Sequence, residues 1–331
     1  MPFWLVVGLA YLFEFANGWT DAPNSIATVV STRVLRPIAA VVMAGVLNLV
    51  GALALGTAVA KTIAGGIVDL NLVSLETVGA AVLAATIWAL SAQYYGLPSS
   101  ESHALVAGLL GSGFAAGGLA GLEWSGTRKS LIGLVTSPLG GFTLGFLLMV
   151  LIYWVFARVR RSVVRAVFGR MQILSAAFMA FSHGTGDGQK TMGIITLAVL
   201  LRNHPPGEVP TQFEIPLWVV VSAAVVMGVG TMVGGWRVVR TLGIRMTHLE
   251  PVQGFAAETA AALAITGATH FGIPVSTTHA IGTSIMGVGA PKRLSAVRWG
   301  VAGRVVAAWI LTWPSCAVLG YLLEKGISAV F

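Results

Sequence analysis

Ten long apolar segments, separated by short polar stretches, account for most of the chain. A helix of about 20 apolar residues is long enough to cross the hydrocarbon core of a bilayer. The segments therefore predict an all-α polytopic membrane protein. They cover residues 3–32, 38–58, 73–95, 97–116, 131–156, 172–201, 216–236, 250–271, 273–290 and 299–323.

The segments at 97–116 and 273–290 are short and rich in glycine, so each of them either crosses the membrane or enters and returns. Positive charges separate these topologies, because Lys and Arg are concentrated in cytoplasmic loops. With ten crossings, fourteen positive residues fall on one side and five on the other, whereas two re-entrant segments divide them about ten against nine. The charges predict ten crossings of the cell (plasma) membrane, with both termini outside.

Composition supports the membrane interpretation. The 331 residues are 56% hydrophobic and 10% charged, whereas soluble domains carry about 25% charged residues. A net charge of +8 would indicate nucleic-acid binding in a soluble protein, but cytoplasmic loops account for it here, so the bilayer and not a nucleic acid is the expected partner. Residues 1–16 lack the features of a signal peptide and are expected to form the first span. The single Cys316 excludes an intramolecular disulfide framework.

A polar stretch at residues 15–25 interrupts the first apolar segment and has a second copy at residues 181–191. A shift of 166 residues pairs Asp21 with Asp187 and Gly18 with Gly184. Carboxylates inside membrane segments are costly and usually face a cavity or a transport pathway. Two of them in equivalent positions indicate one site that is built from two halves.

Five crossings in each half require the second repeat to be inverted relative to the first. We expect a first repeat at 1–157, a basic cytoplasmic linker at 158–171 and a second repeat at 172–331. The fold class is then about ten transmembrane segments in two inverted repeats of five, with broken helices at the midplane.

A second motif, at residues 96–104, matches residues 272–280 at five of nine positions. Its glycine and proline break the preceding helix, and proline suits the first turn of a new one. The hydroxyl cluster would then lie on a first turn, where backbone N–H groups have no partner within the helix. Two such helix starts facing each other would bind an anion. The hydroxyl residues are Ser99, Ser100, Ser102, Ser276, Thr277 and Thr278.

Each of these features also has a simpler interpretation. A Gly–Pro pair with hydroxyls can mark a kink whose freed backbone groups the hydroxyls satisfy. His103 and His279 either pack against a carbonyl of a neighbouring helix or carry protons and shape the site. Glu14 and Glu258 either pair with a polar neighbour or take part in coupling. The remaining two histidines within the segments, His183 and His270, are expected to be structural.

At these motifs the chain resembles the inorganic phosphate transporter (PiT) family, and it is similar to the short prokaryotic members. The family's N-G-x-N-D-x-x-N pattern matches Asn17, Gly18, Asp21 and Asn24, and its second copy matches His183, Gly184, Asp187, Gln189 and Lys190. Ser276, Thr277, Thr278 and His279 match the G-x-P-x-S-T-T-H pattern, which Ser99, Ser100, Ser102 and His103 match approximately. Thr20, Gly186 and Glu101 depart from these patterns, and such departures affect the choice of coupling ion.

The resemblance implies a symporter that imports inorganic phosphate with a cation. It implies substrate binding by Asn24, Ser99, Ser100, Ser102, Gln189, Lys190, Ser276, Thr277 and Thr278. It assigns the coupling ion to Asp21, Asp187 and Asn17, the two aspartates being the sodium ligands if the cation is sodium. A proton-carrying or site-shaping role is left to His103, His279, Glu101 and Glu258.

The residue types support this reading independently. Phosphate suits hydroxyls, amides and N–H groups, whereas bare aspartates would repel it. A cation between carboxylate and phosphate, either a sodium ion or a proton, would couple the two fluxes, because neither charge enters a low-dielectric site cheaply alone. Unwound backbone carbonyls beside Asp21 and Asp187 would supply further sodium ligands. We expect no other cofactor, and a homodimer is an open alternative to a monomer.

Three rival functions remain at this stage. Residues 184–187 match the G-x-G-D signature of intramembrane aspartyl proteases, in which two carboxylates activate water. That chemistry gives the hydroxyl motifs no role, and the chain holds 41 glycines, so the short match is weak. A channel would differ by failing to transport against a gradient, and sulfate or another tetrahedral oxyanion would fit the same donors.

Overall fold

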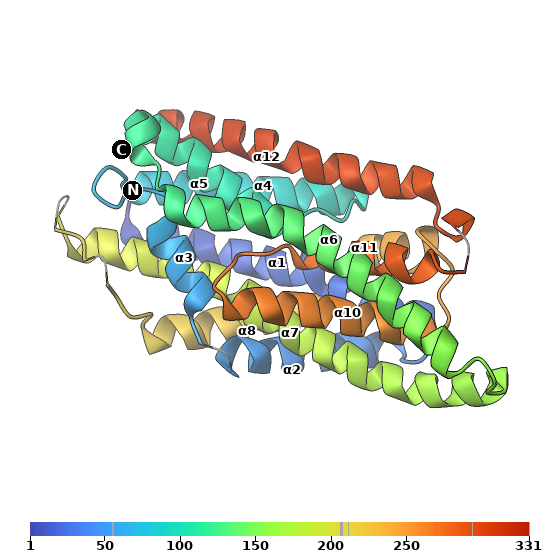
Figure 1. The fold of residues 1–331 in the computed structure, drawn as a ribbon. Coiled ribbons are helices and arrows are strands. Elements are labelled where there is room, and N and C mark those ends of the chain that lie inside the picture. The colour runs from blue at the N-terminus through green and yellow to red at the C-terminus, as the bar shows by residue number, and fades with distance from the viewer. Residues whose placement is uncertain (55, 206–207, 211, 293, 331) are drawn as a thin grey trace.

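The computed structural model describes residues 1–331 except 55, 206–207, 211, 293 and 331. Arg293, one of the positive charges counted above, lies outside the described residues. Helices dominate the described part of the chain and run along one common axis (Figure 1). They are α1 (Phe3–Ser31), α2 (Pro37–Ala54), α3 (Ala58–Gly66), α4 (Leu75–Tyr95), α5 (Glu101–Gly117), η1 (Gly118–Gly121), α6 (Trp124–Val155), α7 (Arg161–Asn203), α8 (Leu217–Val233), α9 (Trp236–Arg240), η2 (Thr241–Arg245), α10 (Pro251–His270), α11 (Thr277–Gly289), η3 (Leu294–Ala296) and α12 (Trp299–Ser328).

Each of the ten apolar segments overlaps with one helix of at least 13 residues, so the prediction of an all-α fold is confirmed. Six helices of the described residues are long and apolar enough to cross a membrane: α2, α4, α5 with η1, α6, α7 and α12. The bent pair of α8 with α9 and η2 is a seventh candidate, with an angle of 58° at its break. Two short helical segments, α3 and α9 with η2, lie where loops were expected.

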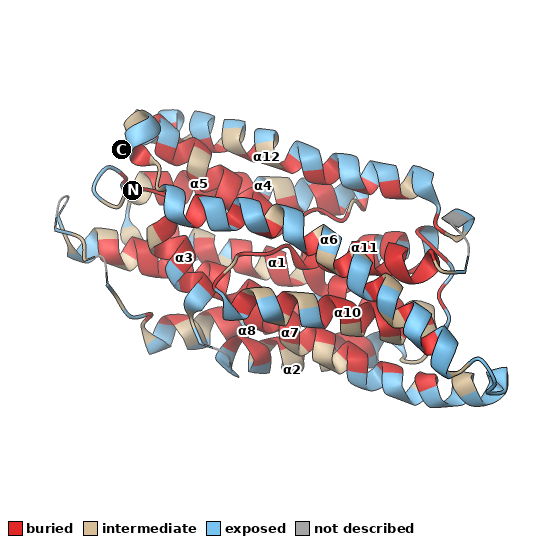
Figure 2. Cartoon of the chain, viewed as in Figure 1, coloured by how far each residue is buried: buried red, intermediate tan, exposed pale blue. Residues whose placement is uncertain are grey.

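Buried residues lie at the centre of the bundle and exposed residues on its outside (Figure 2). The buried set includes many polar and charged side chains. Large apolar residues on the outside include Ile38, Trp154 and Leu174, each more than two-thirds exposed. Asp21 and Asp187 are at most 3% exposed. This distribution suits a chain surrounded by lipid, where apolar side chains face the hydrocarbon and polar ones must find partners inside.

Two helix breaks position the hydroxyl motifs. Gly96 and Gly272 have φ values of 66° and 64°, which residues with a Cβ rarely adopt. They follow α4 and α10, and extended stretches lead from them to α5 and α11. Pro98 and Pro274 lie in these stretches, so the expected place of proline on a first helical turn is wrong. Serine is the preferred residue at the start of a helix, and Ser100 and Ser276 take the N-cap positions.

The starts of α5 and α11 lie against each other, as the sequence predicts. The Ser102 hydroxyl of α5 donates a hydrogen bond of 2.9 Å to the carbonyl of Val275, just before α11. The rings of His103 and His279 are 4.7 Å apart between centroids. Both hydroxyl motifs therefore face one region at the centre of the bundle.

The two halves of the chain pack crosswise. Helix α8 packs on α1, and α2 packs on α7. A Cβ on Gly18 would collide with the carbonyl of Met227 in α8, and a Cβ on Gly184 would collide with the carbonyl of Asn48 in α2. Likewise, α12 packs on α5 and α6 packs on α11. Close backbone contact of this kind, made through small residues, is the usual way in which helices pack inside a membrane.

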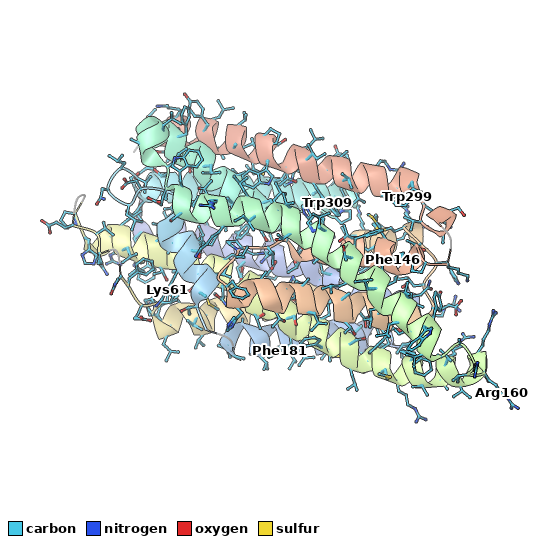
Figure 3. All side chains as sticks on the ribbon, viewed as in Figure 1. Lys61, Phe146, Arg160, Phe181, Trp299 and Trp309 are labelled. Carbon is cyan, nitrogen blue, oxygen red and sulfur yellow. The ribbon has the colours of Figure 1, made fainter. Side chains whose placement is uncertain are left out.

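The two ends of the bundle differ. The N- and C-termini lie at one end (Figure 1), and Arg160 lies at the other (Figure 3). Helix α7 has 43 residues and is about 65 Å long at 1.5 Å per residue, which exceeds the thickness of a bilayer. It includes much of the basic stretch 158–171, so that part of the chain is largely helical.

Candidate functional site

Asp21 and Asp187 meet where α1 and α7 lie side by side. The Thr277 hydroxyl, in the first turn of α11, lies 3.4 Å from an oxygen of each carboxylate. The Thr278 hydroxyl donates a 2.9 Å hydrogen bond to Asp21. The structure thus brings the two equivalent aspartates and one hydroxyl motif together. All four side chains are buried, so the centre is occluded from solvent.

Asn24 completes this part of the centre. It lies one turn beyond Asp21, and its amide nitrogen donates to the hydroxyls of Thr277 at 3.2 Å and Thr278 at 3.0 Å. Its carbonyl oxygen is buried without a hydrogen-bond partner among the described residues. We refer to Asp21, Asn24, Thr277 and Thr278 as the first half-site. The polar groups of this half-site are one carboxylate, two hydroxyls and one side-chain amide.

The second half-site comprises Asp187, Lys190, Glu101 and Ser102. In the internal repeats these residues align, in that order, with Asp21, Asn24, Thr277 and Thr278 of the first half-site. The Lys190 ammonium is 2.6 Å from the Asp187 carboxylate and donates to the Ser102 hydroxyl. Glu101 accepts a 2.9 Å hydrogen bond from Thr20. Charged groups here occupy positions that hold neutral groups in the first half-site.

His183 lies between the two aspartates, so the structural role expected for it from the sequence is wrong. Its Nε2 atom is 3.8 Å from Asp21 and 3.6 Å from Asp187, while Nδ1 lies 3.2 Å from the side-chain oxygen of Asn48. Its alignment with Asn17 in the repeat was the signal that it belongs to the centre. Asp21, His183 and Asp187 have ligand atoms within 4.8 Å of one another, a spacing that can hold a cation.

Several of the expected site residues have other partners. Asn17 donates to Glu14 at 3.4 Å, and Thr191 donates to the same carboxylate. Gln189 accepts a 2.8 Å hydrogen bond from the backbone N–H of Val59 and donates to a carbonyl one turn earlier in α7. These contacts link Asn17 and Gln189 to the walls around the aspartates.

The outer hydroxyls of the motifs stabilise their own helices. Ser100 accepts a hydrogen bond of 3.3 Å from the backbone N–H of His103, and Ser276 accepts one of 3.1 Å from that of His279. Ser99 donates to Glu101 at 3.3 Å. Within the described part of the chain, only Ser102, Thr277 and Thr278 of the six hydroxyl residues form a hydrogen bond with an aspartate, Asn24 or Lys190.

His103 and His279 form an aromatic group with two tryptophans. Trp309 stacks on His279 at 4.0 Å, and Trp313 lies 5.7 Å from His103. Within the part of the chain that the structure describes, no ring nitrogen of either histidine has a hydrogen-bond partner. The contact with a neighbouring carbonyl considered from the sequence is therefore not formed.

Glu258 lies in a separate polar cluster on α10. It accepts hydrogen bonds from Thr28, Gln172 and Ser175. Gln172 in turn accepts a 2.8 Å hydrogen bond from Thr32. This cluster connects α1, α7 and α10 without a residue of either half-site.

The expectation of unwound carbonyls beside the aspartates is wrong. Helices α1 and α7 are continuous through Asp21 and Asp187. The broken backbone lies instead at 97–100 and 273–276, opposite the aspartates. The groups that contact the aspartates are therefore hydroxyl side chains from α11 and not unwound backbone carbonyls.

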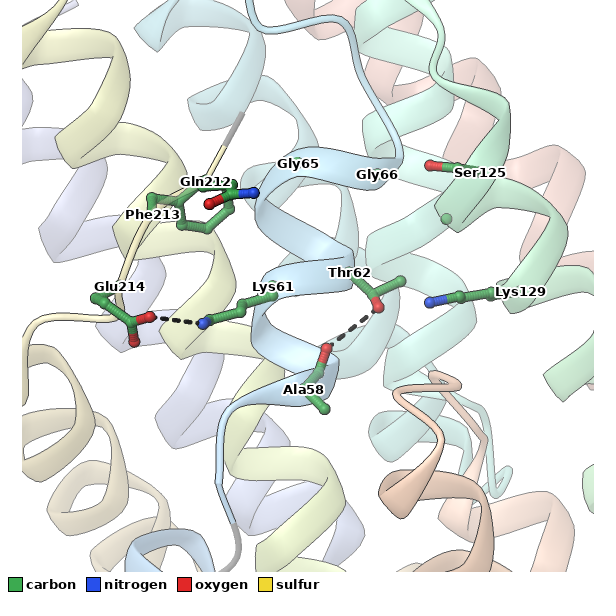
Figure 4. Close-up of a pocket in the computed structure, with 11 residues that line it drawn as sticks. Ala58, Lys61, Thr62, Gly65, Gly66, Ser125, Lys129, Gln212, Phe213 and Glu214 are labelled. Atoms are coloured by element: carbon green, nitrogen blue, oxygen red, sulfur yellow. Dashed lines mark hydrogen bonds and ion pairs between the residues drawn. The ribbon is translucent and has the colours of Figure 1, made fainter. Parts of the chain in front are cut away.

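Cavities open toward both ends of the bundle. One of about 1080 Å³ is lined by Arg33, Arg161, Arg165 and His248, among others. The other, of about 470 Å³, lies between α3 and α6 and is lined by Lys61 and Lys129 (Figure 4). Lys61 pairs with Glu214 there at 3.0 Å. Positive side chains thus line both cavities, together with Glu214 in the smaller one and Glu250 in the larger one.

Comparison with known proteins agrees with this arrangement. The model of the phosphate transporter family matches residues 17–320. A Rhizobium meliloti protein named as a low-affinity inorganic phosphate transporter is 45% identical over 325 residues, which cover 97% of this chain and 96% of that protein. A Bacillus subtilis protein of the same name is 41% identical over 330 residues, covering 99% and 97%.

One solved structure shares the fold over its whole length. It is described as the sodium-dependent phosphate transporter, and it matches with a TM-score of 0.91 at 25% identity, covering 99% of each chain. The likeness extends to both halves, including every element that contributes to the half-sites.

Proposed function

Because the chain belongs to the phosphate transporter family, we propose that it is a secondary active symporter that imports inorganic phosphate with a cation. One observation carries this proposal: two buried carboxylates share the Thr277 hydroxyl at the start of a helix. The helix start and its hydroxyls attract an oxyanion, whereas the carboxylates repel it. A cation resolves this conflict, so phosphate and cation bind together.

We propose sodium as the coupling ion, with the proton as the alternative. Sodium takes oxygen ligands, and Asp21, Thr277, Thr278 and the unpartnered oxygen of Asn24 supply them. The sodium dependence in the name of the structural neighbour points the same way. Phosphate would then contact Ser102 and the threonines, while Ser100 and Ser276 act through the helices that they cap.

The test is uptake of labelled phosphate into proteoliposomes, with sodium and proton gradients imposed separately. We expect phosphate to accumulate above its outside concentration under an inward sodium gradient. Equilibration without accumulation would indicate a channel. Preferential uptake of sulfate would show that another oxyanion is the substrate. Phosphate accumulation driven by the proton gradient alone would show that the proton, and not sodium, is the coupling ion.

The topology that we propose has ten crossings in two inverted repeats, at 1–157 and 172–331, joined by the linker 158–171 on the cytoplasmic side. The paired packing of α8 on α1 and α2 on α7 supports it, because an inverted duplication relates these contacts. The position of both termini at the end opposite Arg160 supports it too. In this arrangement both termini face outward from the plasma membrane.

Thiol labelling tests this topology in a Cys316→Ala background. Cysteines introduced at the exposed Ser162 and Ser295 should react with an impermeant reagent from the cytoplasmic side only. One introduced at the exposed Gln212 should react from outside only. Labelling of Ser162 and Ser295 from opposite faces would rule out the inverted repeat.

A further inference from the structure

The two half-sites use equivalent positions with different charges. The shift of 166 residues that pairs Asp21 with Asp187 also pairs Asn24 with Lys190. Asn24 donates to Thr278 at 3.0 Å. Lys190 donates to Ser102, which the second motif aligns with Thr278. An ammonium group therefore stands in the second half-site where the first has a neutral amide.

The ammonium of Lys190 is committed to Asp187. The lysine is 1% exposed and lies 2.6 Å from the Asp187 carboxylate, which is itself fully buried. A buried charge requires a partner, and separating such a pair leaves two uncompensated charges. Because the ammonium is covalently attached to α7, it cannot leave with the substrate.

Asp21 has no such partner. Its contacts among the described residues are the two hydroxyls of α11, the His183 ring at 3.8 Å and the carboxyl group of Glu101. Glu101, the other carboxyl group of the second half-site, receives hydrogen bonds from Thr20 and Ser99 and forms no ion pair with any of the described residues. The first half-site therefore lacks a resident cation, and its oxygen atoms suit a mobile one.

We propose that Lys190 is a built-in counter-cation for Asp187, so that the aspartate pair takes up one mobile cation per cycle, at Asp21, instead of one at each aspartate. This inference rests on the proposed function, since it specifies the cation side of phosphate symport. The driving force for phosphate uptake is the electrochemical gradient of the cation multiplied by the number of cations moved per phosphate. Moving one cation fewer therefore lowers the driving force by one such gradient. Lys190 thus limits how far phosphate can be concentrated.

The test compares the parent with Lys190→Asn, which restores the residue found at the equivalent position 24. Lys190→Arg keeps the charge, and Lys61→Asn removes an exposed lysine elsewhere. The net charge moved per phosphate is measured in proteoliposomes from the membrane potential at which flux reverses, with potassium and valinomycin setting that potential. We expect the cation count to rise by one in Lys190→Asn and to stay unchanged in the two controls.

An unchanged count in Lys190→Asn would overturn the proposal. So would a folded Lys190→Asn protein that binds no phosphate at saturating sodium and low pH, because a free cation should replace a tethered one. Absence of gradient-driven phosphate uptake in the parent would instead refute the proposed function itself.

A second variant covers the case in which Lys190→Asn does not fold. Asp187→Asn with Lys190→Asn removes both members of the ion pair and leaves the total charge unchanged. If the pair acts as a neutral unit, this variant keeps the parent's cation count per phosphate. Loss of one cation would show that Asp187 binds a mobile ion, and the proposal would fall.

Discussion

The helix contacts at Gly18 and Gly184 are the same in both halves, whereas the polar contacts one turn further on, at Asp21 and Asp187, differ. Each glycine packs on a backbone carbonyl of the helix that crosses it, Met227 in one half and Asn48 in the other. The reciprocal contacts, of Gly230 on Phe15 and of Gly51 on Phe181, are also equivalent. Packing at backbone distance allows no alternative to glycine at any of the four positions.

The polar centre is under a weaker constraint. Asn24 aligns with Lys190, and Thr277 aligns with Glu101. One exchange introduces an ammonium group, which pairs with Asp187, and the other introduces a carboxyl group, which accepts hydrogen bonds from Thr20 and Ser99. The comparison teaches that shape must be kept position by position, whereas a buried polar group can change type as long as it finds a partner.

The largest difference between the half-sites should appear when each aspartate is neutralised. Asp187→Asn leaves Lys190 buried without its ion pair, and breaking such a pair costs about 3–5 kcal/mol. Asp21→Asn removes no resident ion pair, so the protein should fold normally and lose gradient-driven phosphate uptake. Thermal unfolding in detergent measures the first effect and proteoliposome uptake the second. Equal unfolding temperatures for the two variants would contradict the asymmetry.

Hydroxyl removal should give a smaller but still clear difference. Thr278→Val deletes a hydrogen bond to a charged group, worth about 1.5–3 kcal/mol, and should raise the phosphate KM roughly tenfold to a hundredfold. Ser102→Ala should raise it less, because that hydroxyl donates to the Val275 carbonyl. Uptake over a phosphate series at a fixed gradient separates them. A larger increase in the phosphate KM for Ser102→Ala than for Thr278→Val would show that the second half-site contributes more to phosphate binding than the first.

The packing side of the comparison predicts a loss of stability without a specific loss of binding. Gly184→Val forces a side chain against the carbonyl of Asn48, and overpacking of this kind costs about 1–3 kcal/mol. Gly169→Val is the matched control, because a Cβ on Gly169 of the same helix meets no atom within 4 Å. Unfolding temperatures of the purified variants measure the difference. If both are as stable as the parent, α2 and α7 are not in backbone contact.

The smallest effect is expected at the helix caps. Ser276→Ala removes the side-chain acceptor of the His279 N–H, and the loss of an N-cap costs about 1 kcal/mol of stability. The phosphate KM should stay within about twofold of the parent, since a cap hydroxyl that serves its own helix contributes no hydrogen bond to the anion. A tenfold increase in the phosphate KM would show instead that the Ser276 hydroxyl contacts phosphate directly.

Long-range periodicity made much of this structure predictable. The ten apolar segments identified the long helices, and the two repeated motifs placed the aspartates and the helix starts in one centre. Both inferences used patterns that extend over 20 residues or more, or that occur twice. The short α3 and α9 escaped detection, because helices of nine and five residues carry too little pattern to stand out from a loop.

The surroundings of Asp21 and His183 could not be predicted, because they depend on which side chains of other helices reach them in the folded protein. Unwinding at Asp21 was expected because a cation needs oxygen ligands, but α1 stays helical and the hydroxyls of Thr277 and Thr278 reach Asp21 from α11. His183 was overlooked because its role depends on the distance between α1 and α7. A linear sequence does not contain that distance, although the alignment of His183 with Asn17 pointed to the centre.

The crosswise packing has a consequence for the biosynthesis of the chain. The face of α1 around Gly18 is covered by α8, whose Gly230 is translated roughly 200 residues later, or about 10–40 s at 5–20 residues per second. During that interval the face of α1 that α8 covers in the folded protein has no partner from the second half. The nascent protein therefore cannot complete the packing of its first half before α7 and α8 have been synthesised and inserted.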